Sequence, residues 1–262
     1  MNWANEWKKL IQISSFKRGN NSPFTSKEFV DWYELQINHN EYPSNILNKI
    51  LQYIDKDSTI LDIGAGTGAF TIPLSKITQE ITALEPSNEM LFHLKNKLNG
   101  VNVKIINKRI EDLSIKDVNQ CDIVLAAHSL YDVMDIKTEL EKMLYLSKKH
   151  LIIIMGFGKS KFYNDIYQHF KGEYHPPPSY IHLYNILYEM EIPANIEIIK
   201  SMGPQVFKDK EQAINHWSKY LKLPNDKLPE LQTYLSNYIT EIDGKAHINL
   251  EKESAIIVCN KT

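Results

Sequence analysis

Short continuous apolar runs alternate along the chain with segments whose apolar residues recur every three or four positions. A continuous run predicts a strand buried on both faces, and the helical spacing predicts an amphipathic helix. The predicted strands cover residues 59–63, 81–85, 101–106, 121–127, 151–155, 195–200 and 254–259. The predicted helices cover residues 1–17, 27–37, 44–54, 70–77, 88–99, 135–149, 180–190, 209–222 and 228–240. This alternation predicts an α/β fold.

A glycine loop follows the first predicted strand directly. Gly64, Gly66 and Gly68 stand at every second position, and Asp62 adds a carboxylate at the end of the strand. Glycine tolerates positive φ and has no Cβ, so a ligand can approach the backbone N–H groups at the start of a helix. The pattern therefore predicts a bound ligand on this loop.

A second acidic residue follows at the distance expected for a nucleotide site. Glu85 ends the second predicted strand, seventeen residues after Gly68. In nucleotide-binding βαβ units, an acid about 20 residues beyond the glycine loop accepts hydrogen bonds from ribose hydroxyls. We therefore interpret Glu85 as a ribose ligand.

With Asp62-x-Gly64-x-Gly66-x-Gly68 and Glu85, the chain closely resembles the class I S-adenosylmethionine-dependent methyltransferases over roughly residues 44–160. The resemblance implies a Rossmann-like sheet of seven strands, the last antiparallel, with helices on both faces. It implies a helical cap over residues 1–43, a methyltransferase domain over 44–262 and a helical insertion over about 205–242, before the last strand. The implied cofactor is S-adenosylmethionine, converted to S-adenosylhomocysteine, and its implied ligands are Asp62, Gly64, Ala65, Gly66, Gly68, Glu85, Pro86, Ile110, Glu111 and Asp112.

The segment around Ile110 is the least regular part of this resemblance. Arg109 stands where many members carry Asp or Asn, so the polar contact to adenine is expected to shift to Glu111 or Asp112. The alternative is an exposed ion pair between Arg109 and Glu111 without adenine contact.

Two other functions fit parts of the pattern. Residues 64–69 also satisfy the dinucleotide motif G-x-G-x-x-A, which would indicate a dinucleotide-dependent oxidoreductase. Asp62 and the 58 residues that precede the glycine strand favour the methyltransferase, and the lack of Lys-Ser or Lys-Thr after the glycines excludes a P-loop. A module that binds the cofactor without turnover is the other alternative.

The end of the fourth predicted strand carries the candidate catalytic residue, His128, with Tyr131 beside it. Ligands of open α/β sheets bind beyond the carboxyl ends of the strands, so His128 is expected to contact the substrate. The segment resembles quinone-biosynthesis C-methylases, which implies a small-molecule acceptor, and it lacks the Asn-Pro-Pro-Tyr type of signature. His128 either removes a proton from the acceptor or only orients its loop.

Aromatic residues near the N-terminus have two interpretations. Trp32 and Tyr33 lie on the apolar face of a predicted helix and are either core residues or part of a substrate pocket.

Two later segments are candidates for covering the substrate. Residues 160–178 are predicted to be irregular because Pro176, Pro177 and Pro178 break any helix, and they are a candidate lid. The insertion either packs over a sheet edge or caps the substrate.

The composition and charge of the chain indicate which partners and which other kinds of site to expect. The 262 residues carry 30 Lys plus Arg against 32 Asp plus Glu, a net charge of −2 that disfavours a nucleic-acid partner. Cys121 and Cys259 are expected to be buried free thiols in the cytoplasm. His175 and His182 lack the further ligands of a metal site, and no metal is predicted. The longest apolar run, residues 151–155, is too short for a membrane span, no signal peptide is predicted, and no pattern predicts the oligomeric state.

Overall fold

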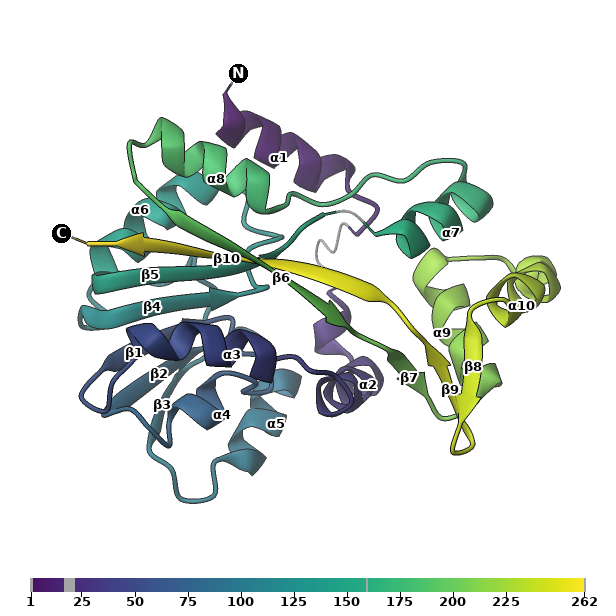
Figure 1. The fold of residues 1–262 in the computed structure, drawn as a ribbon, viewed down its shortest axis with the longest axis horizontal. Coiled ribbons are helices and arrows are strands. Elements are labelled where there is room, and N and C mark those ends of the chain that lie inside the picture. The colour runs from purple at the N-terminus through teal and green to yellow at the C-terminus, as the bar shows by residue number, and fades with distance from the viewer. Residues whose placement is uncertain (1, 17–21, 159, 262) are drawn as a thin grey trace.

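The computed structural model describes residues 2–16, 22–158 and 160–261. A seven-stranded sheet with the order β3-β2-β1-β4-β5-β10-β6 runs through its centre (Figure 1). Its last strand, β10, runs antiparallel to both neighbours, so the predicted fold class is confirmed. The strands are β1 (Thr59–Ile63), β2 (Glu80–Leu84), β3 (Val103–Ile106), β4 (Cys121–Ala127), β5 (Ser147–Gly156), β6 (Asn195–Met202) and β10 (Glu251–Asn260).

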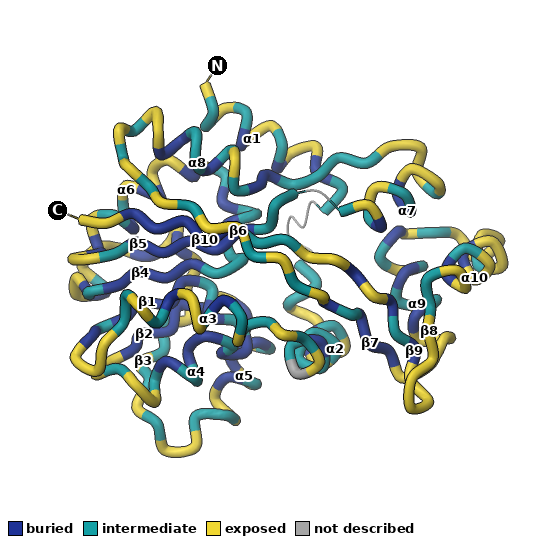
Figure 2. The backbone as a smooth tube through the Cα atoms, in the orientation of Figure 1, coloured by how far each residue is buried: buried dark blue, intermediate teal, exposed yellow. Residues whose placement is uncertain are grey.

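Helices cover both faces of this sheet, and its inner strands β1, β4 and β5 form the most buried layer, whereas much of the edge strand β6 is exposed (Figure 2). One face packs against α1 (Trp3–Ile13), α6 (Ile136–Leu146) and α8 (Tyr180–Glu189). The other face packs against α3 (Ser44–Ile50) and α4 (Thr71–Leu74), while α5 (Asn88–Lys97) packs beside β2. Trp7 fixes the first helix, because its side chain is fully buried and its Nε1 donates to the Val133 carbonyl at 2.8 Å.

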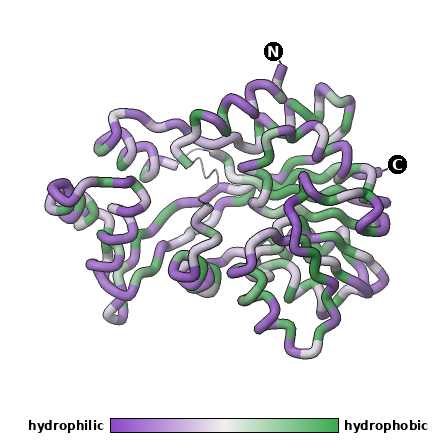
Figure 3. Tube along the Cα trace, turned by 180° about the vertical axis from the view of Figure 1, so that it is seen from behind, coloured by the Kyte–Doolittle hydropathy of each residue, from purple (hydrophilic) through white to green (hydrophobic). Residues whose placement is uncertain are grey.

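The insertion between β6 and β10 forms a second, smaller body. It contains β7 (Gln205–Phe207), α9 (Lys210–Leu221), α10 (Leu228–Ser236), β8 (Ile239–Ile242) and β9 (Lys245–Ile248). The three strands form a separate sheet in the order β7-β9-β8, so the insertion predicted as helical also contains strands. Seen from behind, the trace of the insertion carries many hydrophilic residues, whereas the central strands are mainly hydrophobic (Figure 3).

Two helices join the insertion to the rest of the molecule. Gln36 of α2 (Lys27–Asn38) accepts from the Val206 N–H at 2.7 Å and donates to the Val206 carbonyl at 2.9 Å. Helix α7 (Lys161–Lys171) contributes Phe162, Ile166 and Tyr167 to the apolar core of the insertion. The insertion is therefore held from the N-terminal side and from the segment after β5.

Some predicted elements differ from the structure. Helix α7 lies in the segment predicted to be irregular, so that prediction was wrong over residues 161–171. Helix α6 ends at Leu146, and residues 147–150 extend β5 instead. Met1 and Lys17, the ends of the first predicted helix, lie outside the described residues. Three short 3-10 helices cover Pro23–Thr25, Leu51–Tyr53 and Asn225–Lys227.

Candidate active site

The glycine loop after β1 has one position that faces open space. A Cβ added to Gly66 would meet no atom closer than 4.0 Å, and this residue has a φ of 57°. The other two glycines serve packing, since a Cβ on Gly64 would lie 2.3 Å from Ser129 Cβ and one on Gly68 would lie 2.6 Å from Leu94 Cδ1. A ligand can therefore approach the backbone most closely at Gly66.

Glu85, just beyond the end of β2, faces this loop. Its Oε2 accepts from the Gly66 N–H at 2.9 Å, and its Oε1 accepts from the Ser87 N–H at 2.8 Å. The side chain is buried, and burial raises the pKa of its carboxyl group despite these two hydrogen bonds. Each carboxylate oxygen retains a free lone pair, so Glu85 can accept further hydrogen bonds from a ligand's hydroxyl groups.

Asp62 lies near the end of β1 and is 1% exposed. Its Oδ2 accepts from the Thr71 hydroxyl at 2.6 Å. Burial raises the pKa of the Asp62 carboxyl to about 6, and the nearby Glu85 contributes in the same direction. A carboxylate destabilised in this way gains from a cationic ligand, such as an amino group.

The glycine loop and the loop after β4 each hold a buried hydroxyl without a partner among the described residues. Thr67 Oγ1 and Ser129 Oγ are buried and have no hydrogen-bond partner among the described residues. Buried polar atoms are usually satisfied, so such an atom indicates a missing partner. With the open space at Gly66 and the lone pairs of Glu85, these residues fit a nucleoside ligand that carries a charged amino acid.

The remaining predicted cofactor residues lie around the same edge. Ala65 and Ile110 are buried, whereas Pro86, Glu111 and Asp112 are exposed. Arg109 forms an ion pair with Glu111 at 3.6 Å, which matches the alternative that the sequence left open. Adenine contact by residues 110–112 stays a prediction.

A cavity of about 430 Å³ opens beside the end of β4, and we call it the acceptor cavity. Tyr33, His128 and Tyr131 line it, as does the segment around Pro177 and Pro178 that follows α7. Trp32 is not among its lining residues. The indole of Trp32 stacks on Phe207 and lies 4.2 Å from the His216 ring, in the insertion. Of the two predicted aromatic residues, only Tyr33 faces the cavity.

The His128 ring is held by hydrogen bonds within the acceptor cavity. Nδ1 lies 2.9 Å from Tyr131 Oη, which in turn accepts from the Gly156 N–H at 2.7 Å. Nε2 lies 3.5 Å from Ser254 Oγ. Burial, with a smaller contribution from Lys252, lowers the pKa of His128 to about 4, so the ring is neutral at pH 7.

Several residues of this cavity were not predicted from the sequence. Tyr42 packs edge-on to the His128 ring at 5.5 Å, and Lys252 and Ser254 enter from β10. Phe16, Tyr163, Tyr174 and Tyr220 add aromatic surface. The aromatic residues after position 160 were a detectable signal, whereas Lys252 and Ser254 carry no motif at all.

Among residues 2–16, 22–158 and 160–261, no three His, Cys, Asp or Glu side chains gather as a metal site would require. Within the same part of the chain, no helix is long and apolar enough to cross a membrane. Cys121 and Cys259 are both buried and free, as predicted.

Comparisons with known proteins agree with this geometry. Residues 60–150 match the family model described as a methyltransferase domain. An uncharacterised protein of Haemophilus influenzae is 31% identical over 164 residues, which are 61% of this chain and 60% of that protein. Ribosomal RNA small subunit methyltransferase A of Wigglesworthia glossinidia is 44% identical over 75 residues, 27% of this chain and 28% of its own length. The chain thus spans less than two thirds of these relatives.

Solved structures share the fold at low sequence identity. The YcgJ protein of Bacillus subtilis superposes with a TM-score of 0.58 at 16% identity, covering 83% of this chain and 98% of that one. Magnesium protoporphyrin IX methyltransferase of Synechocystis, solved with bound S-adenosylhomocysteine, has a TM-score of 0.55 at 12% identity and covers 88% and 95%. Residues 60–150 therefore form a methyltransferase domain, and the strand order and the glycine loop support a class I S-adenosylmethionine-dependent methyltransferase.

Proposed function

We propose that this chain transfers a methyl group from S-adenosylmethionine to a small molecule bound in the acceptor cavity. The observation that carries the proposal is the close approach of Gly64 to Ser129, which brings the glycine loop against the loop that begins with His128. A ligand on Gly66 and a second ligand beside His128 would then meet at this contact. A cavity of about 430 Å³ lies within the range for small-molecule sites.

In the proposed complex, each part of the cofactor has its own residues. Asp62 and the backbone of Gly64, Ala65, Gly66 and Gly68 hold the methionine part, Glu85 and Pro86 hold the ribose, and Ile110, Glu111 and Asp112 flank the adenine. The bound cofactor supplies a methyl group activated by its sulfonium. The residues of the chain therefore have to bind, align and exclude water, with Tyr33, Tyr131 and His128 orienting the acceptor.

An RNA acceptor is the second candidate, because the Wigglesworthia relative is named as a ribosomal RNA methyltransferase. That match covers 27% of this chain. The net charge of −2 gives no surplus of cations for phosphate binding, and this supports the small molecule. The buried free thiols of Cys121 and Cys259 support a cytoplasmic protein.

The test uses S-adenosylmethionine carrying a tritiated methyl group and a fractionated lysate of the organism that encodes the protein. We expect the label to enter the small-metabolite fraction. The Gly66→Val variant is the control, since it blocks the loop and should transfer no label. Label found only in RNA or protein would overturn the small-molecule assignment, and an unlabelled lysate together with no binding of S-adenosylhomocysteine would overturn the methyl transfer.

A further inference from the structure

Resting on that proposed function, the lining of the acceptor cavity points to the kind of atom that receives the methyl group. We propose that the acceptor is an amine, methylated on its nitrogen, and that the acceptor cavity binds it as a cation. An excess of acidic residues, a wall of aromatic rings and an amide oxygen without a donor all suit a nitrogen that carries N–H groups and positive charge.

Acidic residues outnumber basic ones around the acceptor cavity. Asp132, Glu251 and Glu253 line it, and Lys252 is the one Lys or Arg among the lining residues that the structure describes. Acids remain in excess when Lys200, which pairs with Glu253 at 3.0 Å, is counted as well. A cation is therefore favoured in this cavity over an anion.

The charge of the lining faces the acceptor rather than the methyl donor. Asp62, Glu85 and the glycine loop, residues 64–68, are not among the residues that line the cavity. The acids around the cavity are therefore additional to the carboxylates that face the glycine loop.

The ammonium group of Lys252 lies to one side. A Cβ added to Gly203 would lie 2.5 Å from Lys252 Cδ and Cε and 2.7 Å from its Nζ, so the end of this side chain rests against the backbone between β6 and β7. Gly203 is not a lining residue of the cavity. The pKa of His128 is about 4, so its neutral ring adds no second positive charge at pH 7.

Aromatic rings form much of the remaining wall. They come from separate parts of the chain: Phe16, Tyr33, Tyr42, Tyr131, Phe157, Tyr163, Tyr174 and Tyr220. The face of such a ring carries partial negative charge and attracts a cation within about 6 Å of its centroid. Several rings around one cavity therefore stabilise an ammonium group that has left water.

Asn40, which follows α2, adds a hydrogen-bond acceptor to this wall. Its Nδ2 donates to the Gln36 carbonyl, which can only accept, so this contact fixes which end of the amide is the oxygen. Oδ1 is buried and has no donor among the described residues. An N–H group of the acceptor would supply the partner that this oxygen lacks.

Nitrogen is the nucleophile that such a lining suits. Phenols, thiols and carboxylic acids attack a methyl group as anions, and the excess of acids disfavours an anion in the cavity. His128, with a pKa of about 4, is also a weak base toward a phenol, which loses its proton near pH ~10. An amine instead attacks as a neutral group through its nitrogen lone pair.

The step balances without proton transfer to the protein. The bound ammonium first releases a proton to water, which leaves a lone pair on nitrogen. This lone pair forms the new bond to the methyl carbon, the bond between methyl and sulfur breaks, and its electron pair stays on sulfur. The positive charge passes from sulfur to the methylated nitrogen, which then lies among the acids and the aromatic rings.

One experiment identifies the methylated atom. The lysate assay is repeated with S-adenosylmethionine carrying a ¹³C-methyl group and with a lysate from cells grown on ¹⁵N-ammonium as their nitrogen source. In NMR spectra of the small-metabolite fraction, we expect the new methyl signal to be split by a one-bond coupling to ¹⁵N. A methyl signal without this coupling would overturn the amine while leaving the methyl transfer in place, whereas no label in small metabolites would count against the proposed function itself.

A pair of probes of equal shape tests the cavity apart from the chemistry. Choline carries a quaternary ammonium group, and 3,3-dimethylbutan-1-ol is its neutral carbon analogue. We expect choline to bind about tenfold more tightly in NMR titrations. Asp132→Asn combined with Glu251→Gln should reduce this preference, and Glu241→Gln should not, because Glu241 pairs with Lys210 in the insertion. Equal affinity for the two probes, binding of neither, or a preference unchanged in the double variant would overturn the cation site.

A third measurement tests Asn40 as a partner for N–H groups. Asn40→Leu should weaken the binding of 2-phenylethylamine about tenfold and leave that of choline, which has no N–H group, unchanged. Asn185→Leu is the matched control, because Asn185 lies on α8, away from the cavity lining, and donates to the Ile181 carbonyl. Equal weakening of both probes in Asn40→Leu would indicate a purely structural residue and would overturn this role.

Discussion

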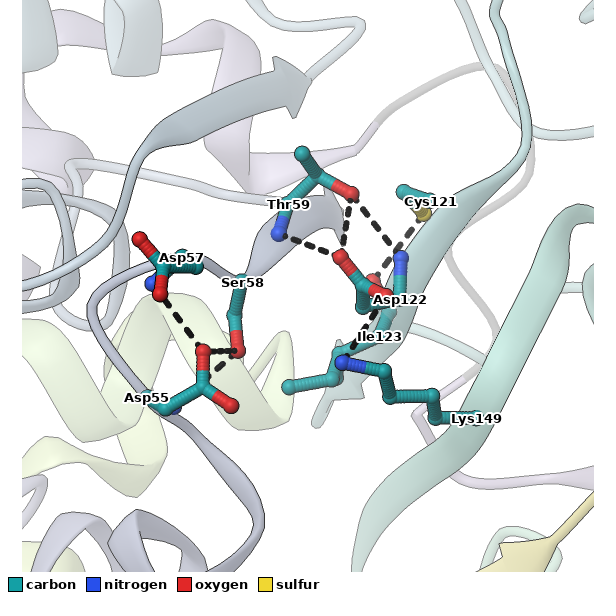
Figure 4. A network of polar contacts seen from close by, with 8 residues as sticks. All are labelled: Asp55, Asp57, Ser58, Thr59, Cys121, Asp122, Ile123 and Lys149. Carbon is teal, nitrogen blue, oxygen red and sulfur yellow. Dashed lines mark hydrogen bonds and ion pairs between the residues drawn. The ribbon is translucent and has the colours of Figure 1, made fainter.

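The carboxylates at the two ends of the parallel strands β1, β2 and β4 lie in opposite electrostatic situations. At the amino end, Asp122 Oδ2 accepts from both the Thr59 N–H and the Thr59 hydroxyl at 2.9 Å, and Oδ1 lies 3.1 Å from Lys149 Nζ (Figure 4). Burial alone would raise the pKa of Asp122, but these partners lower it below its usual value. At the carboxyl end, burial prevails and raises the pKa of both Asp62 and Glu85.

The difference separates a structural carboxylate from one with capacity for a ligand. Asp122 has its hydrogen bonds and its counter-ion within the chain, so its charge stabilises the fold. Asp62 accepts from the Thr71 hydroxyl and Glu85 from two backbone N–H groups, and among the described residues neither has a cation within 4 Å. A ligand that brings hydroxyl groups or positive charge would stabilise these two carboxylates more than it would stabilise Asp122.

The largest effect is expected at the loop between these carboxylates. Gly66→Val should abolish the binding of S-adenosylhomocysteine, expected at micromolar affinity or about −8 kcal/mol, because the new side chain fills the open space. Gly172→Val is the matched control for backbone strain, since it also has a positive φ and has no neighbour within 4 Å of its Cβ position. Calorimetry should show binding lost only in Gly66→Val; equal binding by both variants would place the ligand elsewhere.

Exchanging the acid at each end should separate affinity from stability. Glu85→Ala should weaken the binding of S-adenosylhomocysteine by about 1.5–3 kcal/mol for each ligand hydrogen bond lost, with little change in the Tm of the empty protein. Asp122→Ala should leave the affinity unchanged and lower the stability by about 1–3 kcal/mol, since it leaves Thr59 and Lys149 without their acceptor. Titration calorimetry and thermal melts read the two effects, and a loss of affinity in Asp122→Ala would remove the distinction.

The pH dependence of stability should have opposite signs at the two ends. Asp62 has a folded pKa of about 6, above its unfolded value, so its contribution is favourable below about pH 4 and is lost as the pH rises through 6, by about 3 kcal/mol. Asp62→Asn should therefore stabilise the protein at pH 7 to 8 and not at pH 4. Asp122 has a lowered pKa, so Asp122→Asn should destabilise at neutral pH, and the difference should shrink as the pH falls below the usual carboxyl range. Urea unfolding from about pH 2 to pH 8 covers both changes, and parallel curves for the two variants would contradict this assignment.

The smallest effect is expected at His128. Lys252 contributes to the lowered pKa of this ring, after burial, so Lys252→Met should raise the pKa of His128 above about 4 without bringing it to its ordinary value. An NMR titration of the ring measures the shift. Lys200→Met should leave it in place, and a His128 pKa that is unchanged in Lys252→Met would mean that burial alone sets it.

The half of the molecule that carries the glycine loop could be predicted because its signals are local. The glycine loop, the capping residue Ser87 and the strand Cys121–Ala127 all fall where the sequence put them. Helix α7 was missed although Ser160 at its start and Gly172, in the left-handed conformation, at its end are ordinary helix signals. Because Pro176, Pro177 and Pro178 follow, the whole segment was predicted to be irregular despite these signals.

The acceptor cavity could not be predicted in the same way. Its lining residues are far apart in the sequence and come together only through the register in which the strands pair. Ser254 pairs with Gly156 across β10 and β5, and this pairing brings a serine near His128 from 126 positions away. The strands β7, β8 and β9 were also missed. They are three or four residues long, too short for an alternating pattern to stand out, and most of β8 is exposed.

The position of β10 also has a consequence for the order in which the protein is completed during synthesis. β10 lies between β5 and β6, and in the described sheet β6 pairs with no other strand. The parallel units from β1 to β5 can pair as they leave the ribosome, whereas β6 has to wait for residues 251–260. Lys252 and Ser254 lie on β10, so their side of the acceptor cavity forms only when residues 251–260 pair with β5 and β6. A nascent chain would therefore complete its site for the methyl donor before it completes its acceptor cavity.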